Sequence, residues 1–579
     1  MKKFLVVFIE AMLTFLALLV YDNKFLNDGS YNIFVTLLFF VIFFAYYKYN
    51  VEIGKKERIS IIIISVIFSL LLSVGNIFSK YIWDSPIQIF TFRRLIAIII
   101  MTMGFFVLLL KLFSYTFVKV NKISIKLEKK KMNLSLFLCI LCIIFVGNML
   151  YFIRFYPAIM TADSFYVINY ANNFILSDFH TFGHTWFFGV FFHLGKLLFN
   201  DLNMAVGLST LVQMLCISLL FSITLKYLYE KGISKKICFL VAFIYGFTPL
   251  FGHFSVTLWR DVMFGTAFAP LFIFFYELTS CDKLKKKYIV LFIISTLIIL
   301  FFRNNGIYIY IFMLPFIIGI AKKERKVMTI LSLSILIFYI FIKGPVFNYF
   351  GVAKSKTAEA YSIPLQQMAR VVALNQNVDS KSENYLRKLW NYDKVAQQYK
   401  NVTSDPIKTL TNNNFLKENN REFFQTYLKL FVSNPLTYVE AYLMETIGYW
   451  YPDVIYWATG GENSDLFESE KEIKTTPLTP KWYNEVIDHS VSRAIPFANL
   501  FWSIGLYFML LVLSSALTAY YNKKYLLCYV PLYGLWLSIM AATPVFCELR
   551  YVYGIFTCIP LLVIIPFIVK QSKIEKGGK

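Results

Sequence analysis

The chain alternates between long hydrophobic segments and short lysine-rich turns over most of its length. Most of these segments approach or exceed the roughly 20 residues that an α-helix needs to cross the hydrocarbon core of a bilayer. The pattern therefore predicts an all-α polytopic membrane protein with 14 spans. The predicted spans are residues 4–20, 32–49, 59–78, 95–118, 133–153, 203–229, 237–252, 262–279, 288–302, 307–320, 327–345, 497–520, 525–544 and 551–570.

The lysine-rich turns give the predicted spans an orientation. Lys2 and Lys3, residues 48–58 and residues 119–131 all fall on one side of the predicted membrane. Because short cytoplasmic loops collect lysine and arginine, that side is predicted to be cytoplasmic. Both termini are then cytoplasmic in a multi-pass plasma-membrane protein, and the first hydrophobic segment is an uncleaved helix rather than a signal peptide.

Four regions follow from this arrangement. We expect a four-helix N-terminal membrane segment (1–131), a transmembrane module (132–346), an extracytoplasmic and mainly helical domain (347–496), and C-terminal helices with a cytoplasmic tail (497–579). The first outer loop of the module covers 154–202. Its apolar piece, residues 186–199, is too short to span, so we expect an interfacial helix there.

Composition and charge narrow the class of function. The chain is 58% hydrophobic and 19% aromatic, and its net charge of +23 could suggest nucleic acid as a partner. However, residues 347–496 contain 16 Lys/Arg and 17 Asp/Glu, whereas the remainder contains 41 Lys/Arg and 17 acids. The excess lies in short loops, so we expect membrane lipids and no nucleic acid as partners. The eight cysteines form no disulfide or zinc pattern, and no Walker motif is present.

Ionisable residues beside the predicted spans are the candidates for chemistry, because such groups are costly near lipid. All of them fall at the predicted outer face, where neither ATP nor a sugar nucleotide is available. An activated group would have to arrive on a lipid carrier, and a polyprenyl phosphate is the obvious one. The candidate catalytic residue is Asp163, and the candidate substrate-binding residues are His180, His184, Arg260, Asp261, Arg303, Asn304, Glu548 and Arg550.

A carrier of this kind would need three features. An apolar groove would hold the prenyl chain, and cations would bind the departing phosphate. Arg303, Arg550 and Arg260 suit the second task, because guanidinium matches phosphate oxygens with two parallel hydrogen bonds. A carboxylate would take the proton from the acceptor hydroxyl as it attacks the anomeric carbon, and Asp163 is placed for this.

The order of motifs resembles the GT-C glycosyltransferases. The chain reads YP-x-x-x-TADS in the first outer loop, then TLWRD, RNNG and ELRY. It is similar to polyprenyl-phosphate-sugar-dependent enzymes such as the protein O-mannosyltransferases and the lipid A aminoarabinose transferase, and most similar to a poorly characterised bacterial branch. The resemblance covers about 133–570 and implies a GT-C-like transmembrane module.

In that superfamily the first outer loop carries the catalytic acid, which maps to Asp163, and a later acid is similar to Asp261. The resemblance implies a polyprenyl-phosphate-linked sugar as donor. The acceptor would be an extracytoplasmic glycan such as a cell-wall polymer or teichoic acid, or a lipid or protein. Because TADS has a single acid where a metal-bridging pair would have two, a divalent metal is left open and no other cofactor is expected.

Structural alternatives stand beside these roles. Asp163 could only cap a helix, and His180 and His184 could bind zinc with an acid. Arg260 with Asp261, and Glu548 with Arg550, could be ion pairs, and Arg303 a membrane-interface anchor. At the level of function, the alternatives are a transporter or flippase of lipid-linked sugars and an accessory protein of cell-envelope assembly.

Overall fold

The computed structural model of the chain is helical almost throughout. Within the part that it describes, no β-strand occurs, and β-type pairing is limited to isolated bridges such as Ile159 with Thr257. The described residues are 2–22, 32–48, 54–123, 127–179, 181–281, 283–321, 324–455, 472–490 and 499–577.

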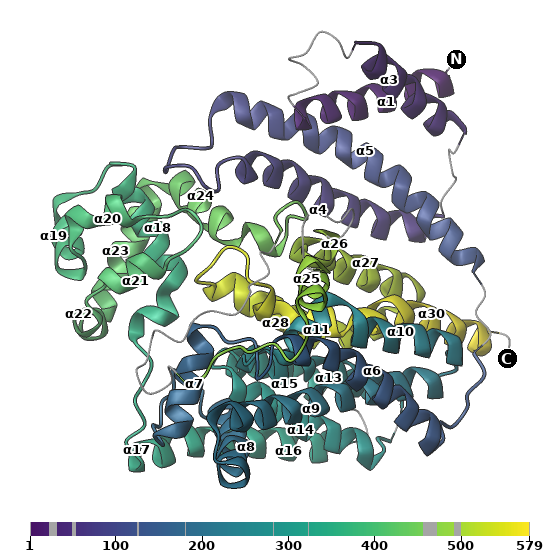
Figure 1. Ribbon diagram of the computed structural model, residues 1–579. Helices are drawn as coiled ribbons and strands as arrows, with labels where there is room; N and C mark the ends of the chain where they lie inside the picture. Colours follow the sequence, from purple (N-terminus) through teal and green to yellow (C-terminus); the bar gives the residue numbers. More distant parts are fainter. Residues whose placement is uncertain are drawn as a thin grey trace.

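The N-terminal helices form a layer on one side of the molecule (Figure 1). Helix α1 packs against α5 and α3, and α4 packs against α5 and against α27 (Ile504–Asn522) of the C-terminal region. Ile64 and Phe68 of α4 share one buried apolar cluster with Leu517 of α27, so this layer is joined to the rest of the protein by a continuous core. The helices are α1 (Lys2–Tyr21), α3 (Asn32–Lys48), α4 (Lys55–Ser79) and α5 (Phe92–Lys122).

The central bundle is organised around α12 and α13, whose sequence from Phe264 to Phe275 combines small residues with large apolar ones. Every residue from 261 to 279 is buried within the protein. Close packing against small residues is how membrane helices approach one another. The bundle contains α6 (Leu134–Arg154), α7 (Ala162–Asn172), α8 (Phe182–Phe199), α9 (Leu202–Glu230), α10 (Lys235–Phe247), α11 (Pro249–Val256), α12 (Arg260–Thr266), α13 (Phe268–Ser280), α14 (Lys286–Phe302), α15 (Gly306–Ile320) and α16 (Arg325–Phe341), followed by the π-helical turn η2 (Ile342–Val346) and α17 (Phe347–Tyr349).

The predicted multi-pass membrane architecture is confirmed at the level of the helices. Nine stretches of the described residues are long and apolar enough to cross a membrane, and ten if the bent pair α10–α11 counts as one span. That pair bends by 54° where Pro249 begins α11. Three predicted spans outside these stretches coincide with shorter helices, namely α3, α14 and α15. The predicted span 525–544 coincides with α28 (Val530–Ala542), which forms a single stretch with α27. Helix α8 is not one of the nine stretches.

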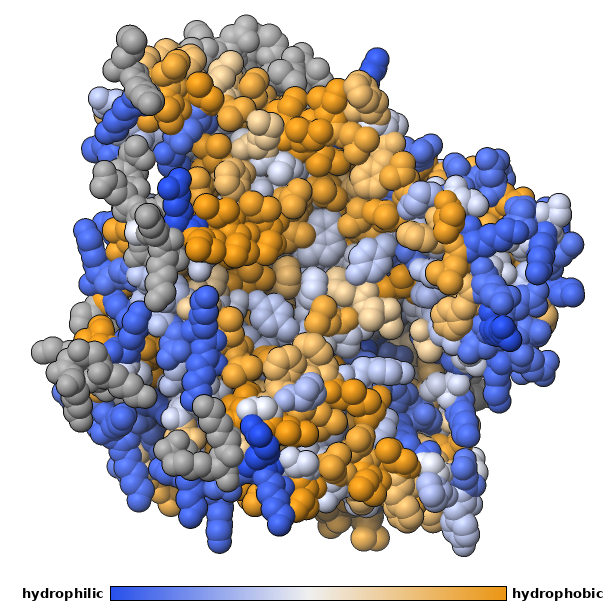
Figure 2. Space-filling model, turned by 180° about the vertical axis from the view of Figure 1, so that it is seen from behind, coloured by the Kyte–Doolittle hydropathy of each residue, from blue (hydrophilic) through white to orange (hydrophobic). Residues whose placement is uncertain are grey.

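Residues 357–446 form a helical lobe with its own apolar core at one end of the bundle (Figure 1). Leu365, Leu386 and Phe423 are fully buried in this core. The surface in Figure 2 is hydrophobic over the bundle and hydrophilic over the lobe, as expected for a bundle in lipid and a lobe in water. The lobe contains η3 (Thr357–Tyr361), α18 (Ser362–Ala373), α19 (Ser380–Leu389), α20 (Tyr392–Gln398), α21 (Asp405–Leu410), α22 (Asn413–Glu418), α23 (Asn420–Ser433) and α24 (Pro435–Thr446).

The C-terminal helices return from the lobe into the bundle, and both chain ends lie on the side opposite to the lobe (Figure 1). Residues 543–548 connect α28 to the helices that close the chain, and they pass beside the base of the lobe. The elements after the lobe are η4 (Ile447–Tyr449), α25 (Lys481–Ser490), α26 (Asn499–Trp502), α27, η6 (Lys523–Tyr529), α28, η7 (Leu549–Val552), α29 (Tyr553–Thr557) and α30 (Ile559–Gly577).

Candidate functional site

Helix α7 presents Asp163 in its first turn. Thr161 is the N-cap residue, and its backbone N–H donates to Ser164 Oγ at 3.1 Å in a capping box. The interpretation of Asp163 as the helix cap is therefore wrong, because Thr161 and Ser164 already perform that task. The side chain of Asp163 is 37% exposed and forms an ion pair with Arg550.

Arg550 joins Asp163 to Glu548. Its Nη1 donates to Asp163 Oδ2 at 2.5 Å, and its Nε donates to Glu548 Oε2 at 2.6 Å. Glu548 and Arg550 belong to the ELRY motif, in which Glu548 is the extended residue directly before the 3₁₀ helix η7 and Arg550 lies inside that helix. The ion pair between them, one of the interpretations open from sequence, is present, and it extends to an acid 387 residues earlier in the chain.

A second ion pair lies beside the first. Arg303 Nη1 is 2.9 Å from Asp261 Oδ1, and these side chains are 13% and 3% exposed. The ring of Tyr551 lies close to both arginines, with its centre 4.4 Å from the guanidinium carbon of Arg303 and 5.3 Å from that of Arg550. We call Asp163, Asp261, Arg303, Glu548 and Arg550 the ion cluster.

Trp259 connects the ion cluster to the cap of α7. Its ring centre is 4.7 Å from the guanidinium carbon of Arg550, and its indole N–H donates to Thr161 Oγ1 at 2.8 Å. Cation–π contacts of this kind fix a guanidinium in place more than they add stability at a partly exposed site. The same aromatic side chain therefore orients both Arg550 and the turn that carries Asp163.

The electrostatics of the cluster favour a function over a purely stabilising role. Burial raises the pKa of Glu548 above its ordinary value, although the adjacent Arg550 opposes this shift. Removing paired charges from water costs about as much as their attraction returns, so a buried ion pair is weak evidence for stability. Five ionisable groups gathered at one end of a membrane bundle are better explained as a binding or reaction site.

A second polar group adjoins the cluster. Asn304 follows Arg303, and its Nδ2 donates to the carbonyl of Asp178 at 2.8 Å while its Oδ1 accepts from Lys343 Nζ at 3.0 Å. Lys343 also forms an ion pair with the carboxylate of Asp178. Asn304 thus belongs to this group rather than to the ion cluster itself.

Arg260 differs from the other arginines. Its Nη1 donates to the backbone carbonyl of Phe179 at 2.5 Å, and among the described residues it forms no ion pair. The expected pair with the neighbouring Asp261 is not formed, because Asp261 turns to Arg303 instead. Arg260 therefore brings a positive charge to this end of the bundle that no described carboxylate balances.

The structure describes one of the two candidate histidines. His184 is buried in the first turn of α8, with its ring 5.8 Å from that of Phe302, and His180 lies outside the described residues. No group of three His, Cys, Asp or Glu side chains in the described part of the chain could hold a metal ion. The carboxylates of the cluster face guanidinium groups, so they fit a cation only if an arginine moves away.

An apolar cavity of about 790 Å³ lies between α7, α8 and residues 342–352. Ser177 and Phe182 form part of its wall, and they flank the segment whose carbonyl groups contact Asn304 and Arg260. The cavity therefore adjoins the polar end of the bundle, and its size suits part of a long hydrocarbon chain. Other lining residues are Phe174, Trp186, Val190, Val346 and Phe347.

Four residues of this region receive no role from the sequence. Trp259 and Tyr551 lie within the motifs TLWRD and ELRY, but in a chain that is 19% aromatic no single ring stands out. Lys343 ends a predicted span, where a lysine usually anchors a helix at the interface. Asp178 stands out in the sequence as an ionisable residue beside His180 in the first outer loop, but the sequence assigns it no role.

The fold and site define an all-α membrane protein with a cluster of acids and arginines beside an apolar cavity. The chain belongs to the family of unknown function DUF6020, which it matches over residues 156–578. No curated protein and no solved structure matches it. The ion cluster lies entirely within the matched residues, whereas α1 to α5 lie outside them.

Proposed function

We propose that this protein is a membrane glycosyltransferase that moves a sugar from a polyprenyl phosphate to a hydroxyl acceptor outside the cytoplasm. The observation that carries the proposal is the convergence of Asp163, Asp261, Arg303, Glu548 and Arg550 next to an apolar cavity. An amphipathic substrate could place its long chain in the cavity and its phosphate and sugar at the ion cluster. A GT-C-like module and an extracytoplasmic lobe are part of the same proposal.

The residues would divide the reaction between them. The prenyl chain occupies the cavity, and Arg260 supplies the unbalanced charge that attracts the phosphate. Arg303 and Arg550 are already oriented by their acids and by Tyr551, so they lose little freedom on binding phosphate oxygens. Asp261 and Glu548 hold these arginines and are positioning residues.

Asp163 would act on the acceptor. The acceptor oxygen attacks the anomeric carbon, the bond from that carbon to the phosphate oxygen breaks, and the electron pair leaves with polyprenyl phosphate. Asp163 takes the proton of the acceptor hydroxyl as the new bond forms. Its partly exposed carboxylate, on a helix anchored by Thr161 and Trp259, is held for this contact.

Replacement of Asp163 by Asn tests the proposal. The variant keeps the size of the side chain and leaves the Thr161 cap intact, so it should insert and accumulate normally. It lacks the proton acceptor, and loss of general-base catalysis costs about 10²–10⁴ in rate. The assay follows release of polyprenyl phosphate from radiolabelled polyprenyl-phosphate sugars, with cell-envelope extract as acceptor.

Asp488→Asn is the matched control, because Asp488 pairs with Arg154 and is not part of the ion cluster. It should transfer sugar at the rate of the unmodified protein. Full activity of the Asp163→Asn variant would overturn the assigned role of Asp163. Movement of the intact lipid-linked sugar across the membrane, with no polyprenyl phosphate released, would assign the protein to the flippases.

A further inference from the structure

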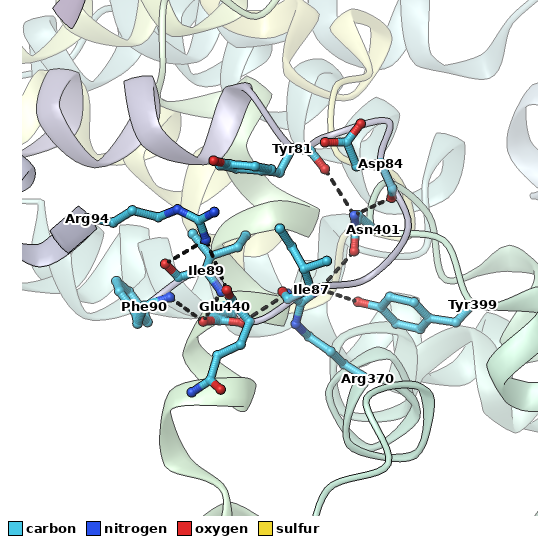
Figure 3. A network of polar contacts seen from close by, with 11 residues as sticks. Tyr81, Asp84, Ile87, Ile89, Phe90, Arg94, Arg370, Tyr399, Asn401 and Glu440 are labelled. Atoms are coloured by element: carbon cyan, nitrogen blue, oxygen red, sulfur yellow. Dashed lines mark hydrogen bonds and ion pairs between the residues drawn. The ribbon is translucent and has the colours of Figure 1, made fainter. Parts of the chain in front are cut away.

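The connection between α4 and α5, residues 80–91, lies outside the part of the chain that matches the family, yet it is built into the base of the lobe. We call this segment the α4–α5 loop. Figure 3 shows that the side chains of Arg370, Asn401 and Glu440 form hydrogen bonds with this loop. Both members of the ion pair Arg370–Glu440 are completely buried, with 0% of each side chain exposed.

Glu440 binds the backbone of the α4–α5 loop directly. Its Oε1 accepts from the N–H groups of Ile89 and Phe90, both at 2.7 Å. Its Oε2 accepts from Arg370 Nη2 at 2.9 Å. The carboxylate thus accepts from three donors, two of which belong to a segment about 350 residues earlier in the chain.

Arg370 and Asn401 hold the other half of the loop. Arg370 donates from Nη2 to the carbonyl of Ile87 at 2.7 Å and from Nη1 to Asn401 Oδ1 at 2.8 Å. Asn401 in turn donates from Nδ2 to the carbonyls of Tyr81 and Asp84, at 3.1 and 3.0 Å. Three side chains of the lobe thus fix the loop near its start, its middle and its end (Figure 3).

The same part of the lobe holds the segment that leads into the ion cluster. Val402, next to Asn401, accepts from the N–H of Phe546 at 2.9 Å, and Ser404 N–H donates to the carbonyl of Pro544 at 3.0 Å. The α4–α5 loop also touches this segment itself, because the rings of Trp83 and Phe546 meet edge to face with centres 5.5 Å apart. Glu548 follows two residues later.

From these contacts we propose that the α4–α5 loop and its buried clamp position residues 543–548, and through them Glu548 and Arg550, for the reaction. A buried ion pair contributes little net stability, but removing one partner leaves the other charge buried and unpaired, which is costly. Conformations that separate the two side chains are therefore strongly disfavoured. The N-terminal helices are thereby a support of the site and not an independent appendage.

The effect on transfer activity depends on the proposed function, so the decisive measurement is independent of it. Cys547 lies in the positioned segment and is completely buried, as is Cys528 in η6. The full-length protein in lipid nanodiscs is exposed to a small permeant thiol reagent, and the labelling of each cysteine is followed by mass spectrometry. Local opening of residues 543–548 exposes Cys547 and leaves Cys528 protected.

Glu440→Gln and Asn401→Ala remove clamp contacts, and each should accelerate labelling of Cys547 about tenfold or more, with Cys528 unchanged. If those variants accumulate poorly, Trp83→Ala provides a second test of the proposal. Trp83 is 76% exposed, so its replacement should not prevent folding. It should accelerate labelling of Cys547 severalfold through the loss of its contact with Phe546.

Glu383→Gln is the matched control, since it removes an ion pair with Arg387 on the lobe surface. It should leave both labelling rates as they are in the unmodified protein. Unchanged labelling of Cys547 in the clamp variants, or equal acceleration at Cys528, would overturn the proposal. Faster labelling of Cys547 in a protein without transferase activity would support the clamp and reject the proposed function alone.

Discussion

Arg550 is the residue on which the candidate site depends most. It contacts Asp163 and Glu548 through separate nitrogen atoms and lies beside the rings of Trp259 and Tyr551. Only a planar group with several N–H donors in fixed directions can make these contacts together. A lysine offers the same charge at a single point and cannot bridge two carboxylates in this geometry.

We therefore expect Arg550→Lys and Arg303→Lys to weaken donor binding by about 1–3 kcal/mol, the worth of a charge-assisted hydrogen bond. KM for the polyprenyl-phosphate sugar should rise accordingly in steady-state assays. Arg387→Lys, which changes an arginine–glutamate pair on the lobe surface, is the control and should leave KM unchanged. Unchanged KM in both site variants would make these arginines structural.

At the scale of elements, the positions of α7 and α8 decide what the cavity can bind. Gly189 of α8 lines the cavity, and a Cβ at that position would meet Ala171 of α7 at an ordinary contact distance of 3.5 Å. A methyl group can thus be added here without forcing the helices apart, and a longer side chain would continue from it. It would extend into space that the proposal assigns to the prenyl chain.

Gly189→Leu should lower the affinity for long-chain donors and leave that for short-chain analogues unchanged. Excluding two methylene groups from the cavity costs about 1.6 kcal/mol, more than tenfold in affinity. The comparison uses donors of graded chain length with otherwise identical headgroups. Gly319→Leu is the matched control, because no atom lies near a Cβ at that position on α15. An equal loss for all chain lengths would remove the cavity from the donor site.

The helices were predictable because hydrophobic length alone identifies a segment that can span a membrane. The meeting of the ion-cluster residues was predictable too, because helix ends on one side of a bilayer lie in the same layer. The pairing within that layer was not. Asp261 pairs with Arg303 and not with its neighbour Arg260, which depends on where α14 ends relative to α12.

Other features depend on long-range contacts that cannot be recognised from the local sequence. Arg370 reads as an ordinary charged residue of an amphipathic helix, yet it is fully buried by a loop that lies about 280 residues earlier. The π-helical turn after α16, which brings Lys343 to Asp178, has no recognisable sequence pattern. Likewise, Thr161 as the cap of α7 only becomes evident once Ser164 is seen to complete the capping box.

At the scale of the whole molecule, the lobe and the two chain ends lie on opposite sides of a hydrophobic bundle (Figures 1 and 2). The lysine-rich turns predict that the chain ends face the cytoplasm. The lobe and the ion cluster beside it would then face outward. This orientation decides whether the substrate can be a nucleotide sugar from the cytoplasm or must come on a lipid carrier.

Single cysteines in a cysteine-free background test the orientation in intact cells. A cysteine at the exposed Lys388 of the lobe should react with an impermeant thiol reagent, whereas one at the exposed Lys235 should react only after the cells are opened. The cysteine-free parent protein provides the background signal. Labelling at position 235 alone would reverse the orientation and with it the choice of substrate.

The contact between Asp163 and Arg550 spans 387 residues and has a consequence for the synthesis of the protein. Membrane helices are inserted in order as the chain leaves the ribosome, so Asp163 reaches its place long before its partner is made. The ion cluster can be completed only when Glu548 and Arg550, which follow the lobe and α28, reach the bundle. An unfinished chain, even one with the lobe already folded, would lack the cluster, and under the proposed function transfer activity would begin only once assembly is complete.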